Sequence, residues 1–126
     1  MKTSIIIVLA VTTVVYGIST DRFNKIRDDM LKCAEEQAWT SDIPNSEVLM
    51  CTARKDGKIL NTNGELMRDA ALQAIEEAFP DVNTREMVQD IYKKCHDKAD
   101  QSGITGHEQA VKITSCSIPA AIFFLI

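Results

Sequence analysis

Four cysteines divide the 126-residue chain unevenly, with 17, 43 and 20 residues between successive ones. Structural zinc sites usually hold their ligands in close pairs such as C-x2-C, and this sequence has no such pair. Each cysteine falls on the apolar face of an expected helix, so a disulfide can link one helix to another. Four cysteines allow three pairings, which all stay open at this point. The pattern favours two disulfides over a metal site, and the positions are Cys33, Cys51, Cys95 and Cys116.

The first 19 residues have the composition of a secretory signal peptide. Lys2 is their only charged residue, residues 5–15 are mostly apolar, and the small residues Gly17 and Ser19 follow. A membrane anchor is the alternative, but it needs about 20 apolar residues and this run is shorter. We therefore expect cleavage after Ser19, secretion of the protein to the extracellular space, and a single domain at residues 20–126. Cysteines are oxidised to disulfides in that environment.

Apolar residues recur every three or four positions in five segments, which is the spacing of one helical face. No segment alternates apolar and polar residues as a half-buried strand would. Asn83 or Thr84 is expected to cap the fourth segment, and Thr105 with Glu108 forms a capping box before the fifth. The sequence therefore predicts an all-α fold, a compact bundle of five to six short helices. The segments are 21–37, 47–55, 65–79, 85–98 and 105–116.

The composition and the motifs exclude several classes of function. A net charge of −4 argues against a nucleic-acid-binding surface, which needs a cationic patch. Cys95-His96-Asp97 resembles the His-Asp pair of secreted phospholipases, but the Gly-rich calcium loop and the adjacent second cysteine of those enzymes are missing. Neither a Gly-x-Ser-x-Gly nor a His-Glu-x-x-His motif occurs. We expect an exposed His96 and no enzyme, with no catalytic residue, metal ion or cofactor.

Several motifs, taken in order, resemble those of insect odorant-binding proteins. Residues 48–57 (VLMCTARKDG) are similar to the third helix of that family, and Asn63-Gly64 precedes a long helix. Tyr92-Lys-Lys-Cys95 ends the next helix, and residues 107–116 (HEQAVKITSC) close the pattern. The resemblance covers about residues 21–117. It implies an all-α fold around an apolar cavity.

The cysteines depart from the usual pattern of that family, which has six. Glu47 and His107 stand where the second and fifth cysteines would be. The chain is therefore similar to the four-cysteine, "minus-C" branch of the family. That resemblance implies the bridges Cys33–Cys51 and Cys95–Cys116.

The segment between the first two cysteines is also shorter than in that family. Residues 38–45 leave room for a turn at most, where the family has its second helix. Trp39, the only tryptophan, either fills part of this gap or anchors the core.

The resemblance implies a secreted carrier of a small apolar ligand such as an odorant, a pheromone or a lipid-like molecule. A membrane receptor or a second copy of the chain would be a further partner. One alternative is a non-carrier interaction protein of haemolymph or gland secretion that uses its apolar tail, and another is a secretoglobin-like dimer, which fits the cysteine positions poorly. The expected wall residues of the cavity are Phe23, Ile26, Met67, Ile75, Phe79, Met87, Val88, Ile91, Val111 and Phe123.

The end of the chain, residues 118–126, is almost entirely apolar. Pro119 prevents a simple continuation of the preceding helix. Phe123 and Phe124 are adjacent, so that only one of them can point into a cavity. We expect the tail to fold back as a wall or lid of the cavity, while a tail that contacts a membrane or a partner is the alternative.

Overall fold

The computed structural model describes residues 20–126, and the predicted signal peptide at residues 1–19 lies outside this part of the chain. Within it, six α-helices and one short 3-10 helix follow one another, and no strand forms. The prediction of an all-α bundle with two disulfides is confirmed. The elements are α2 (Asp21–Glu36), α3 (Ser46–Asp56), α4 (Arg68–Ala78), α5 (Val82–Ser102), α6 (Gly106–Cys116), α7 (Ile118–Ala121) and η1 (Ile122–Phe124).

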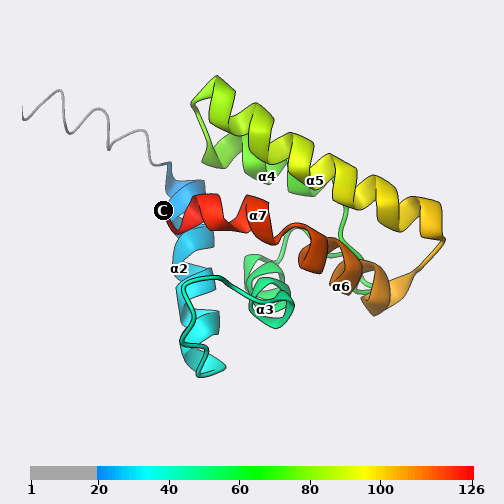
Figure 1. Cartoon of the computed structure of the whole chain (residues 1–126), viewed down its shortest axis with the longest axis horizontal. Coiled ribbons are helices and arrows are strands. Elements are labelled where there is room, and N and C mark those ends of the chain that lie inside the picture. Colours follow the sequence, from blue (N-terminus) through cyan, green and yellow to red (C-terminus); the bar gives the residue numbers. More distant parts are fainter. Residues whose placement is uncertain (1–19) are drawn as a thin grey trace, which may run out of the picture.

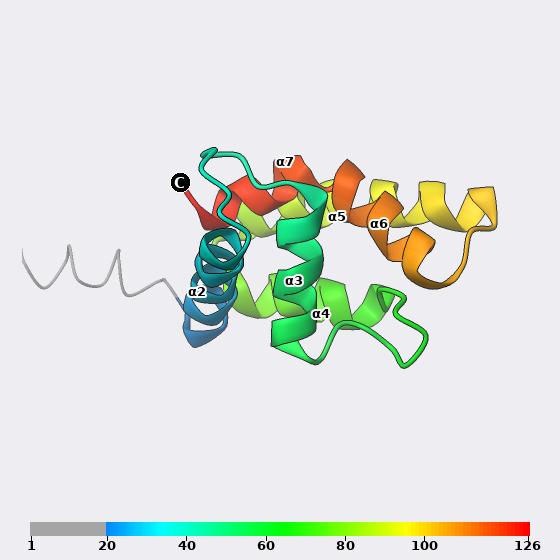
Figure 2. The ribbon, with the colours of Figure 1, turned by 90° about the horizontal axis from the view of Figure 1, so that it is seen from below.

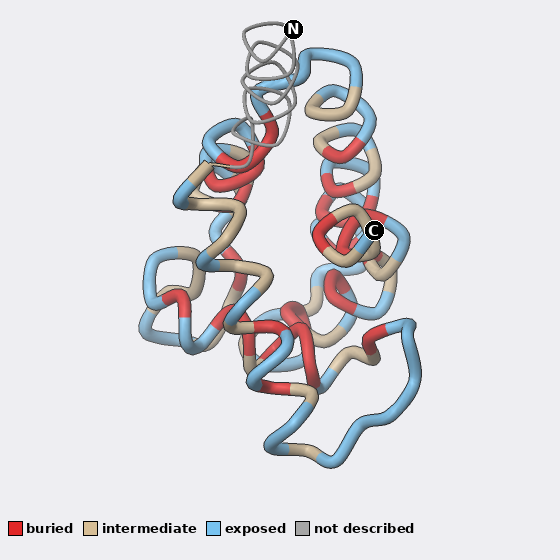
Figure 3. The backbone as a smooth tube through the Cα atoms, turned by 90° about the vertical axis from the view of Figure 1, so that its left-hand side faces the viewer, coloured by how far each residue is buried: buried red, intermediate tan, exposed pale blue. Residues whose placement is uncertain are grey.

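The helices surround a common interior. Helices α4 and α5 pack side by side, α2 packs on α3 and α4, and α6 packs on α3 and α5 (Figure 1). Helix α3 is seen end-on in Figure 1 and along its full length in Figure 2. The last elements return to the start of the domain, because α7 contacts both α3 and α5 and η1 contacts α2. Buried positions lie on the sides of the helices that face one another (Figure 3).

The two disulfides join helices that are neighbours in the sequence. Cys33–Cys51 links α2 to α3 with the Cα atoms 5.8 Å apart, and Cys95–Cys116 links α5 to α6 with the Cα atoms 5.6 Å apart. These are the pairs that the resemblance implied. Closing a loop of this length stabilises a fold by about 3 kcal/mol in the chain-entropy model. Each bridge therefore makes a substantial contribution for a domain of this size.

No helix forms between α2 and α3, as the short spacing predicted. Residues 37–45 make turns, and Ala38 adopts a left-handed conformation with φ 53°. The indole N–H of Trp39 donates to the carbonyl oxygen of Ile43 at 2.8 Å, and 37% of Trp39 is exposed. Trp39 therefore lies at the surface of this segment and does not anchor the core.

Helix α4 begins three residues later than predicted. Residues 59–67 fold back on themselves, because Asn61 N–H donates to Glu65 O at 2.9 Å and Met67 N–H donates to Ile59 O at 2.8 Å. The Asn61 side chain also accepts from the Glu65 N–H at 2.9 Å. These bonds hold Glu65 in a turn, so that the helix starts only at Arg68.

The predicted cap of α5 is wrong, and that of α6 is correct in position but makes no capping hydrogen bond. Asp81 caps α5 and accepts from the Thr84 N–H at 2.9 Å, so the helix begins at Val82, before the expected caps Asn83 and Thr84. Thr105 precedes α6, but its side chain makes no capping hydrogen bond. The Gly106 N–H donates instead to the Glu65 carboxylate at 2.9 Å. Hydrogen bonds from Asn61 and then from Gly106 lower the pKa of Glu65.

Candidate functional site

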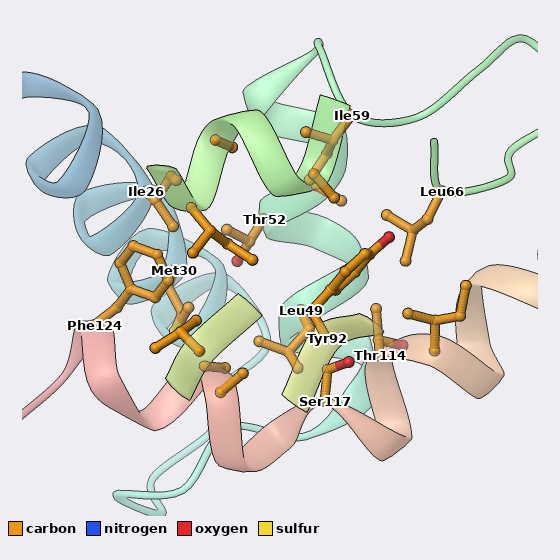
Figure 4. Close-up of a pocket in the computed structure, with 18 residues that line it drawn as sticks. Ile26, Met30, Leu49, Thr52, Ile59, Leu66, Tyr92, Thr114, Ser117 and Phe124 are labelled. Atoms are coloured by element: carbon orange, nitrogen blue, oxygen red, sulfur yellow. The ribbon is translucent and has the colours of Figure 1, made fainter. Parts of the chain in front are cut away.

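An apolar cavity of about 130 Å³ lies at the centre of the bundle (Figure 4). All six α-helices, the 59–66 segment and η1 contribute to its wall. Five wall residues are alanines, whose small side chains leave the space open. The cavity is lined by Ile26, Met30, Leu49, Thr52, Ala53, Ile59, Leu66, Ala71, Ala74, Ile75, Val88, Tyr92, Ile113, Thr114, Ser117, Ala120, Ala121 and Phe124.

Four wall residues carry a hydroxyl group, and three of these groups have partners. Thr52 donates to Val48 O at 2.7 Å, and Thr114 donates to Ala110 O at 2.9 Å. The Tyr92 hydroxyl lies 2.8 Å from the Nδ1 atom of His96. The Ser117 hydroxyl is buried and has no hydrogen-bond partner within residues 20–126. Leaving such a group unpaired costs about 1–3 kcal/mol.

The wall carries no formal charge. None of the described residues that line the cavity is an aspartate, glutamate, lysine, arginine or histidine. Burial raises the pKa of Tyr92, which keeps its phenol protonated at neutral pH. Burial also lowers the pKa of His96, although Asp100 opposes this, and His96 is 5% exposed instead of exposed as predicted. The hydrogen bond between the Tyr92 hydroxyl and the His96 ring therefore joins two neutral groups.

Three of the ten predicted wall residues line the cavity, namely Ile26, Ile75 and Val88. Phe23 and Phe79 instead flank Phe124 just outside it, with ring centroids 5.3 and 4.8 Å from that of Phe124. Of the two adjacent phenylalanines in the tail, Phe124 lines the cavity and the predicted Phe123 does not.

The other four predicted wall residues lie elsewhere. Met67 is 37% exposed because it precedes α4, where the sequence predicted a helical position. Met87 is 52% exposed on α5, because its neighbour Val88 takes the inward position. Ile91 and Val111 are half-buried outside the cavity wall.

Several residues of the wall are absent from the list of expected wall residues. Met30 lies one turn after Ile26 on the same face of α2, so the helical spacing contained this signal. Ile113 is fully buried and lies three residues after buried Ala110 on α6. The alanines carry no such signal, because alanine occurs as readily in a filled core as in the wall of a cavity.

A second hollow, a mainly apolar groove of about 590 Å³ that Glu35, Ser41 and Asp42 also line, opens at the surface beside the cavity. It lies between α2, the 39–44 segment and the end of the chain. Leu31, Trp39 and Ile43 line it and are 52%, 37% and 54% exposed. Met30 lines both hollows and therefore separates the groove from the cavity.

The described residues contain one group that resembles a metal site, formed by Cys33, Glu36 and Cys51. Both of its cysteines are joined in a disulfide, so neither thiolate can coordinate a metal ion. None of the helices of residues 20–126 combines the length and the hydropathy needed to cross a bilayer.

The described residues thus form a disulfide-linked helical bundle with an uncharged, apolar cavity. The chain belongs to the ant venom allergen Sol i 2 family, which is odorant-binding-protein-like and whose family model matches residues 32–121. The match runs from the middle of α2 to the end of α7 and includes both disulfides. No curated protein and no solved structure matches the chain.

Proposed function

We propose that the protein is a secreted carrier that binds one small, neutral, apolar molecule in the cavity of Figure 4. The observation that carries this proposal is the uncharged cavity at the meeting point of six helices. Apolar pockets with few polar groups bind apolar ligands, and two disulfides hold the surrounding helices in place. Family membership and the two bridges support an extracellular protein of the odorant-binding type. The proposal also includes a relationship to the four-cysteine, "minus-C" branch of odorant-binding proteins, because Glu47 and His107 stand where the second and fifth cysteines of the six-cysteine pattern would be.

The size of the cavity limits the ligand. An engineered apolar cavity of about 150 Å³ holds a benzene molecule, so a cavity of about 130 Å³ suits a ligand with a single ring or a short chain. Such molecules are volatile and poorly soluble in water. A carrier would raise their concentration in an aqueous secretion.

The experiment that tests this proposal is a titration of the protein with toluene, followed by NMR. We expect saturable shifts at residues of the cavity wall. Ala74→Leu adds a side chain to the wall and should abolish these shifts, because it fills the space. Ala70→Leu is the matched control on the same helix, outside the wall, and should bind toluene as the wild type does. A wild-type protein that shows no saturable shifts would contradict the carrier function.

A second candidate function is an interaction through the apolar groove. The exposed side chains of Leu31, Trp39 and Ile43 favour it, because exposed apolar patches of this kind mark interaction sites. The tail contributes less than the sequence suggested, since Phe124 is buried and Ile126 is its most exposed residue, at 86%. Sedimentation of the protein with and without liposomes distinguishes the two functions. Binding to liposomes or self-association, in the absence of toluene binding, favours the groove.

A further inference from the structure

Ser117 lies at the junction of α6 and α7, on the wall of the cavity. It is 9% exposed, and Figure 4 places its side chain beside that of Thr114. The other wall residues that follow it in the chain, Ala120, Ala121 and Phe124, present only carbon side chains. A hydroxyl group in such surroundings is costly unless it is hydrogen-bonded.

The backbone around Ser117 explains why its hydroxyl stays unpaired. A serine before a helix usually accepts from the N–H of the second or third helical residue. Here the second residue is Pro119, which has no N–H, and the third, Ala120, donates to the Ser117 carbonyl at 2.9 Å. The carbonyl oxygens of Ile113 and Thr114 already accept from the Ser117 N–H, at 2.8 and 3.2 Å.

The contrast with Thr52 and Thr114 singles out Ser117. Both threonines donate their hydroxyl protons to carbonyl oxygens of their own helices, so neither proton is free for a ligand. The hydroxyl of Ser117 makes no hydrogen bond within the described residues, so its proton is not used. Among the hydroxyl groups of the described wall, Ser117 can therefore donate to a bound oxygen atom without breaking an existing hydrogen bond.

We infer that Ser117 hydrogen-bonds an oxygen atom of the ligand, and that the ligand is a small hydrocarbon body with one neutral alcohol, phenol or carbonyl group. This inference rests on the proposed carrier function. A carboxylate or an ammonium group would lie in the cavity without an opposite charge, because no ionised side chain lines the wall. A pure hydrocarbon would leave the Ser117 hydroxyl unpaired.

Phenol and toluene test the inference, because they share a ring and differ in a hydroxyl against a methyl group. The quantity to measure is the ratio of the phenol affinity to the toluene affinity, by NMR titration of the full secreted protein. Phenol and toluene are hydrated to different extents in water. This difference is the same for every variant, so it cancels when the ratios of two proteins are compared. We expect Ser117→Ala to lower this ratio about tenfold, which corresponds to one hydrogen bond. Toluene affinity should stay within about twofold of the wild type.

Ser115→Ala is the matched control, because Ser115 lies on the same helix and is exposed. It should leave the ratio unchanged. Thermal unfolding checks that Ser117→Ala folds as the wild type does. If both probes bind and the ratio is the same in the wild type and Ser117→Ala, the role of Ser117 is refuted and the carrier function stands. If neither probe binds the wild type, the carrier function fails, and the inference fails with it.

Discussion

At the scale of single residues, the hydrogen bond between Tyr92 and His96 is the most sensitive to pH. The two side chains lie one turn apart on α5, and both are buried. The groups that act on the His96 ring are Asp97 and Asp100 on the same helix and Arg68 on α4. Burial dominates and lowers its pKa, so the folded protein resists protonation of His96.

We therefore predict that His96 makes the fold less stable in acid. The unfolded chain binds a proton at this site near the ordinary pKa of 6.5, and the folded chain does so only at a lower pH. The contribution of His96 is thus complete above about pH 6.5 and is lost as the pH falls through the folded pKa. Urea unfolding between pH 7.5 and pH 5 measures it. His96→Gln should flatten this dependence, whereas His107→Gln, at an exposed position, should keep it.

Met30 is the residue that limits the length of a ligand, because it alone lines both the cavity and the groove. We predict that Met30→Ala connects the two hollows, so that n-butylbenzene binds the variant and not the wild type. The substitution should also cost about 2–5 kcal/mol of stability. Met50→Ala removes an equally buried side chain away from both hollows, and should destabilise without admitting the longer probe. Equal binding of n-butylbenzene to both variants would show that Met30 is not the barrier.

At the scale of helices, a buried ion pair fixes the start of α2 against the end of α3. The Arg22 guanidinium binds the Asp56 carboxylate through two hydrogen bonds, and the side chains are 12% and 2% exposed. The sequence reasoning did not single out these residues, because they are distant in the chain and charged. The pair adds a second link between the two helices that Cys33–Cys51 joins near the end of α2 and in the middle of α3.

Removing one partner of this pair should be strongly destabilising. We predict that Asp56→Ala lowers the free energy of unfolding by about 3 kcal/mol, because the largely buried Arg22 loses both hydrogen bonds and keeps only the exposed Glu77 carboxylate, 3.5 Å from its Nε atom. Asp97→Ala breaks the exposed pair with Arg68 and should cost less than about 1 kcal/mol. Urea denaturation at pH 7 compares the two. A cost for Asp56→Ala that is no greater than for Asp97→Ala would refute the structural role.

The helices themselves were largely predictable from the sequence, and the cavity was not. Periodic apolar residues located α2, α3 and α6 to within a residue or two, because each has one face that must be buried. The start of α4 was misplaced, since hydrogen bonds of Asn61 with Glu65 hold Glu65 in a turn that the apolar spacing does not indicate. Whether a cavity forms depends on the side chains that the other helices place opposite each apolar face. Helical spacing therefore identified Ile26 and Val88 but could not reject Met87.

At the scale of the whole molecule, the C-terminal segment acts as one wall of the cavity. Phe124 stacks on Phe23 and also contacts Phe79, so it connects η1 to α2 and to the end of α4. The expectation that the tail folds back over the cavity agrees with these positions. Its role in retaining a ligand stays a prediction.

We predict that Phe124→Ala destabilises the protein by about 3–5 kcal/mol and accelerates the release of bound toluene. Both effects follow from the loss of a buried ring at the cavity wall. Phe123→Ala is the matched neighbour, only half-buried and outside the wall, and should have a smaller effect on both measurements. Calorimetry and NMR exchange provide the two readouts. If Phe123→Ala has the larger effect, the orientation of the tail is wrong.

The two disulfides also determine what a protease would leave behind. Each bridge closes a short stretch of chain, 33–51 or 95–116, and none of the cysteines joins the front of the domain to its back. A single cut in the exposed turn around Thr62 and Asn63 would therefore divide the domain into two fragments with no covalent link between them: the crosslinked pair α2 and α3, and the segment from α4 to η1 with its own disulfide between α5 and α6. Only packing of α2 and α3 against α4, α6 and α7 would then hold the fragments together. A nicked molecule would keep its shape until denaturant or dilution separated the halves.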